Sequence, residues 1–532
     1  MRNERKEIYM EKSLWIASKK AKEYESLIED SKADVCIIGG GLTGISTAYY
    51  LSKEGKKVVV LEKSYIGSHT TGNTTGKITS QHGLFYSYLI NSMGENKAKK
   101  YLEANEQAIK NIENIVIKEN IDCDFEKQDS YVFTQKLEEI QKIKEEVHAL
   151  NTLGFNAEFV DKIGIPIKIK EAQEEIDKIN PNKNININKP VLGAIKFSNQ
   201  AQFNSYKYIL GLAQKVEENG GKIYEDSEVI EVKKCDDEYL VKTNKASVKA
   251  KYVVIASHYP IVNFPGFYFM KMYQETSYLI AIETKQELFD GTYISSENPS
   301  ISLRTAIYDG KRVVIIGGMQ HKTGAKIDLS DSYKNLEKVA KDLYPDSKVL
   351  FKWSSEDCIS LDKIPYIGEF SSLMPNVYVG TGYKKWGMTT SNVAANIITD
   401  KILGKENKYE EVFDSKRLQP IKNYEELTNM VKEVSYSLVI NKLKKEEEYV
   451  KDIKMGEGKI VEIEGKKVGI YKDENNYIYA VKPYCTHLGC ELSWNNLEKT
   501  WDCPCHGSKF NYDGKNIYDP AIKDLERLDT EK

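Results

Sequence analysis

Four cysteines and two histidines gather in two short segments of the 532-residue sequence. Residues 485–490 read C-T-H-L-G-C, and residues 503–508 read C-P-C-H-G-S. Each segment holds a cysteine and a histidine at close spacing, Cys-x-His in the first and Cys-x-x-His in the second. Two thiolates and two imidazoles suit a [2Fe–2S] cluster in which cysteines bind one iron and histidines bind the other. Neutral imidazole makes its iron easier to reduce, so such a cluster has a higher potential than an all-cysteine cluster.

A structural zinc site made of two cysteines and two histidines is the alternative. Zinc sites usually take both cysteines from one loop and both histidines from another, whereas each loop here offers one of each. The turns at Gly489, Pro504 and Gly507 are also what two apposed cluster loops require. We therefore favour the iron–sulfur cluster. The remaining cysteines, Cys490 and Cys505, lie at matching places in the two loops and could form a disulfide.

These loops closely resemble those of the Rieske proteins of the cytochrome bc complexes, which read C-T-H-L-G-C and C-P-C-H-G-S. The resemblance implies four cluster ligands and one disulfide between the loops: Cys485, His487, Cys503 and His506 as ligands, and the Cys490–Cys505 pair. One position departs from the pattern, because high-potential members carry a tyrosine where this chain has Phe510. Since a hydroxyl donor to the cluster is missing, we expect a lower potential than in the respiratory proteins.

A glycine-rich turn between two apolar segments indicates a second cofactor. Residues 33–38 (A-D-V-C-I-I) and 57–61 (K-V-V-V-L) are predicted strands, with a predicted helix between them. The turn contains G-x-G-x-x-G, and an acid follows the second strand; the residues are Gly39, Gly41, Gly44 and Glu62. The glycines let a diphosphate approach the helix N-terminus, and the acid accepts hydrogen bonds from ribose hydroxyls. This context predicts a dinucleotide site.

Two further loops are predicted to lie against the same cofactor. Residues 67–83 are crowded with glycine and hydroxylated residues, which suits a loop along the diphosphate and flavin ring; a threonine-capped turn is the alternative. Residues 380–390 (G-T-G-Y-K-K-W-G-M-T-T) lead into a helix whose N-terminus can stabilise negative charge on a reduced flavin. The candidate contacts of these loops and of the predicted strand 227–232 are Gly72, Thr75, Val229, Gly382, Trp386, Gly387, Met388 and Thr389.

Residues 33–405 as a whole resemble the D-amino-acid oxidase and glycine oxidase family of FAD-dependent oxidoreductases. The matching motifs are G-G-G-L-T-G, D-x-x-P-Y-I-G at 362–368 and G-T-G-x-x-x-W-G-M-T at 380–389. The resemblance implies FAD, a Rossmann-type domain, a substrate sheet facing the flavin, and oxidation of C–N bonds of amino acids or amines. The chain departs at Asp357, near which oxidases of amino acids often carry a carboxylate-binding arginine. Arg304 could supply that charge from the predicted sheet, or be a surface strand residue.

The expected fold is α/β, with a Rossmann-type FAD-binding domain, an inserted antiparallel-sheet substrate domain and a small C-terminal all-β Rieske domain. Alternating patterns between about residues 265 and 350 predict the antiparallel sheet. We place an N-terminal helical extension at 1–32 and the oxidoreductase domain at 33–405, with insertions at about 91–190 and 263–352. A helical linker at 406–450, with an amphipathic helix in 423–445, precedes the Rieske domain at 451–532.

Composition limits the classes of protein that remain. A chain of this length exceeds one compact core, and 41% hydrophobic with 29% charged residues is typical of globular proteins. The net charge of −3 argues against a general nucleic-acid or anionic-membrane binder. The lysine- and glutamate-rich N-terminus does not resemble a signal peptide, and no apolar run reaches the length of a membrane span. We therefore expect a cytoplasmic protein, where a disulfide is unusual.

Only one dinucleotide motif is visible, whereas flavoproteins reduced by NAD(P)H through a second Rossmann domain would show two. The sequence therefore favours an amine-like substrate that reduces FAD directly, with electrons leaving singly through the [2Fe–2S] cluster to an external protein or quinone acceptor. Candidate catalytic residues are Tyr278, Arg304 and His321, each of which could instead be structural. The alternatives are a non-catalytic electron-transfer protein serving a redox partner, and electron flow in the reverse direction.

Overall fold

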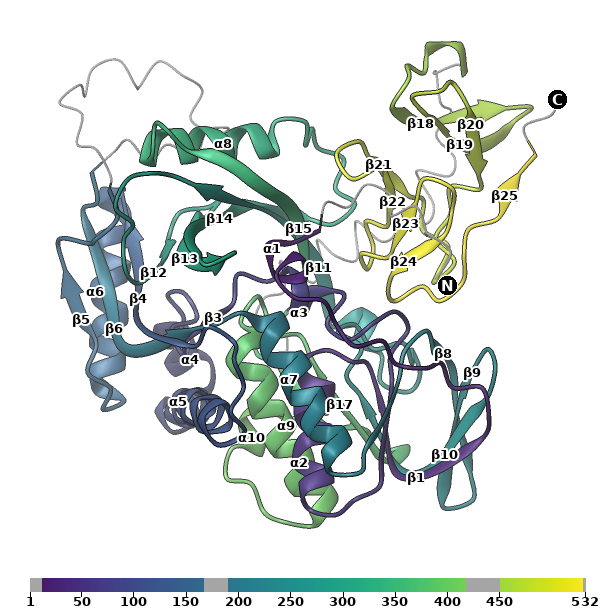
Figure 1. Cartoon of the computed structure of the whole chain (residues 1–532), viewed down its shortest axis with the longest axis horizontal. Helices are drawn as coiled ribbons and strands as arrows, with labels where there is room; N and C mark the ends of the chain where they lie inside the picture. Colours follow the sequence, from purple (N-terminus) through teal and green to yellow (C-terminus); the bar gives the residue numbers. More distant parts are fainter. Residues whose placement is uncertain (1–11, 167–189, 418–449, 530–532) are drawn as a thin grey trace.

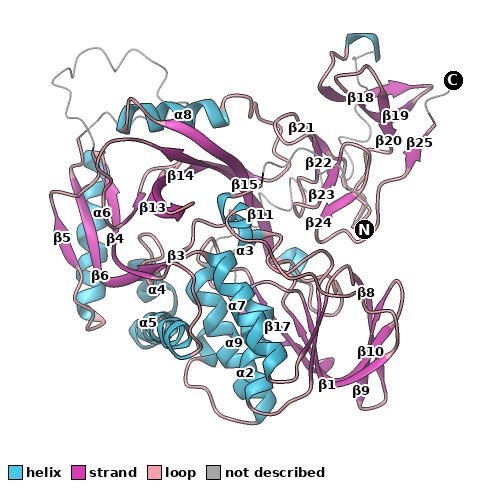
Figure 2. Ribbon diagram, viewed as in Figure 1, coloured by secondary structure: helices cyan, strands magenta, loops and turns pink. Residues whose placement is uncertain are grey.

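A computed structural model describes residues 12–166, 190–417 and 450–529, and Figures 1 and 2 show their arrangement. Two large sheets with their helices form the first part of the chain. A smaller all-β part, green to yellow in Figure 1, packs beside the strands β11 (Met272–Glu283) and β15 (Lys348–Ser360). The predicted fold class is therefore confirmed.

The first large sheet has a parallel centre. Its order is β16-β17-β10-β1-β2-β7, with β9 and β8 extending from β10. The short β2 strand (V-V-V-L) is buried along its whole length, because its two faces pack in different cores, one with residues of α2 (Leu42–Lys53) and α7 (Ser205–Glu218) and the other with residues of β8 and β9. The strands are β1 (Ser31–Ile38), β2 (Val58–Leu61), β7 (Lys222–Tyr224), β8 (Val229–Cys235), β9 (Glu238–Thr243), β10 (Ser247–Ile255), β16 (Tyr366–Ser371) and β17 (Met374–Thr381).

Three helices pack together beside this sheet: α2 (Leu42–Lys53), α7 (Ser205–Glu218) and α9 (Gly387–Leu403). The helix α2 begins directly after β1, and α9 begins soon after β17. Because β1 and β17 both run parallel to β10, the N-termini of both helices lie at the edge where these strands end. That edge is where ligands bind in open α/β sheets.

The second large sheet has nine strands and is mostly antiparallel. Its order is β15-β11-β14-β13-β12-β4-β6-β3, with β5 beside β6, and only β12 and β4 pair in parallel. It is built from β3 (Lys77–Ile78), β4 (Glu126–Thr134), β5 (Glu158–Val160), β6 (Gly193–Gln202), β11 (Met272–Glu283), β12 (Thr292–Ser295), β13 (Ser302–Tyr308), β14 (Lys311–Lys322) and β15 (Lys348–Ser360). The helices α6 (Leu137–Thr152) and α8 (Ser332–Leu343) pack on its strands, whereas α4 (Tyr86–Met93) packs on α6 and α5, and α5 (Glu95–Lys118) packs on α4 and α9.

The all-β part contains two four-stranded antiparallel sheets. One is β18 (Glu457–Ile463), β19 (Lys466–Lys472), β20 (Ile478–Val481) and β25 (Arg527–Leu528); the other is β21 (Ser493–Asn495), β22 (Thr500–Asp502), β23 (Lys509–Asn511) and β24 (Asn516–Tyr518). The segment 485–490 follows β20, and the segment 503–508 joins β22 to β23. The two sheets therefore present both loops that the sequence singles out.

Short helices complete the described part of the chain: α1 (Leu14–Ala17), α3 (Thr70–Asn73), α10 (Glu410–Phe413) and the 3₁₀ turns at Tyr268–Met270 and Val450–Asp452. Of the expected N-terminal helical extension, the described residues 12–30 are helical only over Leu14–Ala17. The linker helix expected in 423–445 lies outside the described residues. In the described ranges, no helix is both long and apolar enough to cross a bilayer.

Candidate functional site

A cavity lies where β1, β2 and β10 end and where α2 and α9 begin. Six of the predicted cofactor residues line it: Gly39, Gly41, Glu62, Val229, Gly387 and Met388. A Cβ on Gly39 would lie 2.5 Å from the carbonyl oxygen of Ala256, and one on Gly44 would lie 1.9 Å from that of Gly39. Only glycine permits this close packing, which leaves the end of β1 and the start of α2 open to a bound diphosphate.

Glu62 is the buried acid of this cavity. Its carboxylate accepts hydrogen bonds from the backbone N–H groups of Gly40 (2.7 Å) and Ser64 (2.9 Å). Burial raises its pKa, and these two hydrogen bonds oppose that rise. The residue is therefore fixed at the end of β2, with acceptor capacity left for ribose hydroxyls. The cavity, its glycines and this acid fit FAD.

Four other predicted cofactor residues, Gly44, Gly72, Gly382 and Thr389, are not among the residues that line either cavity. Gly72 packs against the carbonyl of Gly67, where a Cβ would lie 2.4 Å from the oxygen. The hydroxyl of Thr389 donates to the carbonyl of Thr79 at 3.2 Å. These residues shape the loops around the cofactor site, and direct contacts from them stay predictions.

A second cavity of about 620 Å³ lies against the nine-stranded sheet. Thr75 and Trp386, both predicted cofactor contacts, line it, whereas Thr71 and Met388 of the same two loops line the first cavity. The two cavities therefore border each other along these loops. The volume of the second cavity is in the range of small-molecule sites, so we call it the candidate substrate cavity.

Charged groups of opposite sign face each other in the substrate cavity. The ammonium of Lys385 lies 2.9 Å from the carboxylate of Glu275 and 3.1 Å from the hydroxyl of Ser277. Burial raises the pKa of Asp357 to about 6, although Lys385 opposes that rise. None of the described residues that line this cavity is an arginine. The cavity thus offers a carboxylate at the position where the resemblance leads us to look for an arginine.

The three predicted catalytic residues are not among the residues that line either cavity. Tyr278 is fully buried, accepts a hydrogen bond from Asn495 (3.4 Å) and stacks on His321 at 5.7 Å between ring centres. Asn495 belongs to the all-β part, so this pair faces the domain interface. Their catalytic role stays a prediction, for which this placement offers no support.

Arg304 is 2% exposed, so it is not the surface strand residue offered as an alternative. It donates hydrogen bonds to the carbonyl oxygens of Thr75 (2.9 Å), Gly76 (2.7 Å) and Phe203 (3.2 Å). Its guanidinium also lies over the ring of Trp15 at 5.1 Å. Arg304 therefore fixes the loop that contributes Thr75 to the substrate cavity.

The four predicted cluster ligands lie together in the two loops of the all-β part. Cys485 and Cys503 are buried free thiols, and the rings of His487 and His506 are 5.0 Å apart. The Nδ1 atoms of both histidines are buried without a hydrogen-bond partner. A buried polar atom without a partner costs free energy, and binding to iron would remove that cost at both rings. Two thiols and two such imidazoles fit the expected [2Fe–2S] cluster.

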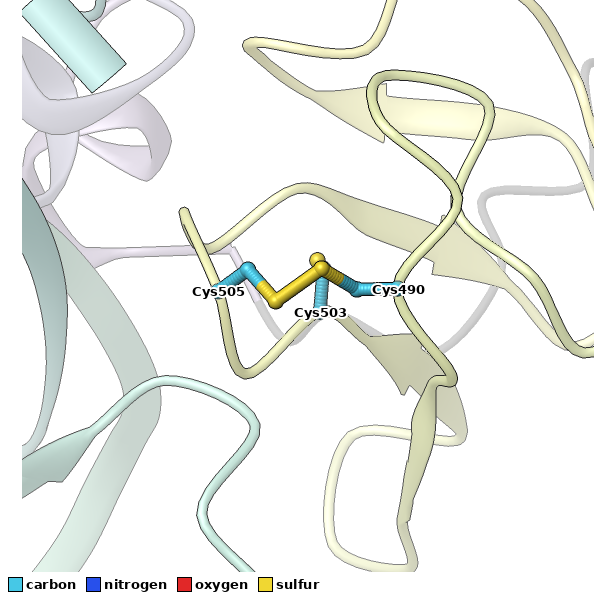
Figure 3. A group of neighbouring side chains, drawn as sticks. All are labelled: Cys490, Cys503 and Cys505. Carbon is cyan, nitrogen blue, oxygen red and sulfur yellow. A yellow bond between two sulfur atoms is a disulfide. The ribbon is translucent and has the colours of Figure 1, made fainter. Parts of the chain in front are cut away.

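Cys490 and Cys505 form the disulfide that the resemblance implies. Figure 3 shows this pair beside Cys503, and the three sulfur atoms lie within 4.8 Å of one another. Because the disulfide uses two of these sulfurs, only Cys503 of this group remains as a metal ligand. The disulfide joins the loops directly beside the predicted cluster.

The histidine face of the cluster loops packs against the flavin-binding part of the chain. The Nε2 atom of His487 lies 2.7 Å from Oδ1 of Asn263, and the ring of Phe269 stands edge-on to His506 at 5.9 Å. A Cβ on Gly507 would lie 2.4 Å from Gln274, and one on Gly324 would lie 2.5 Å from the backbone of Pro504. These contacts place residues 263–274 directly over the cluster loops.

A buried ion cluster joins the two parts beside this contact. The ammonium of Lys509 pairs with Glu356 (2.8 Å) and with Glu498, and all three side chains are at most 5% exposed. The hydroxyl of Ser354 also donates to Glu498. Since Glu356 belongs to β15 and Lys509 to β23, the ion cluster connects the substrate sheet to the all-β part.

Residues 34–401 match the DAO family, described as FAD dependent oxidoreductase. The chain belongs to this family. Residues 445–529 match the Rieske [2Fe-2S] domain. The protein is therefore an oxidoreductase with FAD and a Rieske [2Fe–2S] cluster as cofactors, which disfavours the non-catalytic alternative.

One relative matches both domains of the chain, and others match the oxidoreductase domain alone. The chain is 36% identical over 515 residues, 97% of each chain, to the "Putative Rieske 2Fe-2S iron-sulfur protein YhfW" of Bacillus subtilis. It is 22% identical to the gamma-glutamylputrescine oxidoreductase of Escherichia coli, over 73% of this chain and 87% of the relative. The structure of glycine oxidase from Geobacillus kaustophilus shares the fold, with 18% identity, a TM-score of 0.58 and coverage of 73% of this chain and all of that chain.

Sequence reasoning missed the residues through which the two domains meet. Asn263, Lys509 and Asp519 lie far from each other in sequence, and no motif links them. The acidic residues in the segment 353–358 (W-S-S-E-D-C) were a partial signal, because acids within an apolar strand need a buried partner. Their partner could not be named without the fold.

Proposed function

We propose that this oxidoreductase oxidises a C–N bond of a cationic amine in the substrate cavity and passes the electrons through the Rieske domain to an external acceptor. When bound, FAD supplies a hydride acceptor and the [2Fe–2S] cluster a one-electron acceptor. The observation that supports the substrate class is Asp357, a carboxylate in the 620 Å³ cavity bordering the flavin site. The relative that acts on gamma-glutamylputrescine, an amine, is consistent with it.

Asp357 suits the binding of a substrate ammonium group. A charge-assisted hydrogen bond from ammonium to a partly buried carboxylate is stronger than a neutral one, so it orients the carbon beside the nitrogen. With its pKa raised to about 6, Asp357 is mostly ionised at neutral pH. Lys385 pairs with Glu275 at 2.9 Å, and the substrate ammonium would pair with Asp357.

The contacts between the domains support the electron route. Residues 257 and 258 line the FAD cavity, and Asn263 of the same segment contacts the predicted ligand His487. One short stretch of chain thus connects both cofactor sites. In this route the external acceptor, a protein or a quinone, takes the electrons from the Rieske domain.

The test is anaerobic reduction. The purified protein is mixed with a panel of primary, secondary and tertiary amines and amino acids, and flavin absorbance is followed together with the EPR signal of the cluster. We expect an amine to bleach the flavin and the cluster signal to appear afterwards. Asp357→Asn should raise KM for that amine, and Asp357→Glu should restore it in part.

A matched control is Asp309→Asn, at an exposed turn of the same sheet with φ of 48°. The Asp309 variant should reduce like the unchanged protein. If both centres stay oxidised with every amine, yet dithionite reduces both, amine oxidation is refuted. If a reduced protein donor instead supplies electrons to cluster and flavin in that order, the flow runs in reverse.

A further inference from the structure

The wall of the FAD cavity is not made by the oxidoreductase domain alone. Three of its lining residues, Tyr518, Asp519 and Ile522, belong to the Rieske domain. Tyr518 is the last residue of β24 and is 6% exposed, and Asp519 and Ile522 follow that strand. A domain that matches an electron-transfer module thus contributes side chains to the flavin site.

An ion pair crosses the domain boundary inside this wall. The ammonium of Lys63, next to the predicted ribose-binding acid Glu62, lies 2.9 Å from the carboxylate of Asp519, and the two side chains are 20% and 13% exposed. Burial alone would lower the pKa of Lys63, but the carboxylates around it, Asp519 first and then Glu228 and Glu62, outweigh burial and raise it. Removing Asp519 would therefore leave a mostly buried cation at the adenosine end of the cavity without this partner.

Tyr518 contacts the loop that the sequence predicts along the diphosphate. Its hydroxyl lies 3.0 Å from the hydroxyl of Thr70, and its ring stands edge-on to His69 at 5.1 Å between ring centres. Thr70 begins the short helix α3, and both partners of Tyr518 line the cavity themselves. The Rieske domain therefore supports this loop directly.

We propose that residues 518–522 of the Rieske domain form part of the FAD-binding site, so that tight FAD binding requires the docked Rieske domain. The same segment is tied to the cluster loops, because the N–H of Ala521 donates to Ser508 Oγ at 3.0 Å. Flavin binding and the position of the cluster are thus coupled through the five residues 518–522. This proposal does not depend on which substrate the enzyme oxidises.

The experiment measures FAD affinity in protein that retains its cluster. FAD is stripped from the full-length protein, and the dissociation constant is obtained by titration with FAD while flavin fluorescence is followed. Asp519→Asn should weaken FAD binding about tenfold, the effect of losing one charge-assisted interaction. The double variant Lys63→Met/Asp519→Asn should bind no more weakly than Lys63→Met alone, because Asp519 acts through Lys63.

Asp513→Asn is the matched control, since Asp513 pairs with Arg527 on the surface of the same domain at 2.7 Å. It should bind FAD like the unchanged protein. An unchanged cluster EPR spectrum shows that each variant domain is folded. Should Asp519→Asn lose its cluster, Ile522→Ala takes its place and should weaken FAD binding severalfold.

Hydrogen exchange gives an independent measurement on the unmodified protein. FAD should slow exchange in peptides spanning residues 514–525 as well as in the glycine turn at 39–44. Protection of the glycine turn without protection of 514–525 would overturn the proposal. So would an Asp519→Asn variant that keeps its cluster and binds FAD as tightly as Asp513→Asn.

Discussion

Asn263 is hydrogen-bonded to the predicted cluster ligand His487, and its replacement should shift the potential of the cluster. The amide oxygen of Asn263 lies 2.7 Å from Nε2 of His487, while Nδ1 of that ring is free to bind iron. The oxygen carries partial negative charge and stabilises the more positive, oxidised cluster. Asn263→Leu, which has a similar shape without the acceptor, should therefore raise the potential.

The magnitude follows from the strength of one hydrogen bond. A neutral hydrogen bond contributes about 1 kcal/mol, and this free energy corresponds to roughly 40 mV for a one-electron couple. Asn263→Asp keeps the acceptor and adds a full negative charge beside the ligand. It should shift the potential in the opposite direction and by at least as much.

The assay is a redox titration of the full-length protein with mediator dyes, in which the cluster EPR signal is recorded against the applied potential. Asn475→Leu, at an exposed turn of the Rieske domain, is the control and should leave the potential unchanged. If both Asn263 variants have the potential of the control, the hydrogen bond to His487 does not tune the cluster. A fall in potential for Asn263→Leu would refute the assigned sign.

Three further predictions test the interface, the substrate cavity and the cluster. Lys509→Met should lower the free energy of unfolding by about 3–5 kcal/mol in chemical denaturation, because it leaves buried carboxylates without their cation. The control Lys482→Met, at an exposed lysine, should change the free energy of unfolding by less than about 0.5 kcal/mol. Equal losses in the two variants would contradict the stabilising role of the ion cluster. Burial raises the pKa of Asp357 to about 6, so the rate of flavin reduction by the amine should rise as pH increases through that value. Asp357→Asn should remove this dependence of the rate on pH. The same dependence in the variant would assign the titration to another group. Phe510→Tyr should raise the cluster potential by roughly 40 mV, one added hydrogen bond, and a redox titration showing no rise would contradict the sequence-based explanation.

Sequence predicted best those features that depend on residues close together in the chain. The cluster loops were identifiable because two thiolates and two imidazoles at short spacing have few chemical uses. The glycine turn was identifiable for a similar reason: a Cβ at Gly44 would lie 1.9 Å from the carbonyl of Gly39, so the backbone itself specifies the residue. Their ligand and cofactor roles stay predictions at the level of single residues.

The faces of the substrate sheet could not be assigned from sequence. Alternation along β11 shows that Ser277 and Tyr278 point to opposite faces, but not which face meets the substrate. In the structure Ser277 and Glu275 line the cavity, while Tyr278 packs against the Rieske domain. A catalytic role for Tyr278 would require its face of β11 to line the substrate cavity. Docking of a second domain is a long-range event that period-two patterns do not encode.

The position of Tyr518 and Asp519 in the flavin cavity has a consequence for biosynthesis. The ribosome makes the glycine turn at 39–44 several hundred residues before it makes the segment 518–522. A nascent chain therefore lacks one wall of its flavin cavity until the Rieske domain has been synthesised and has docked. If tight flavin binding requires this wall, as we propose, flavin is captured stably only after the Rieske domain has docked.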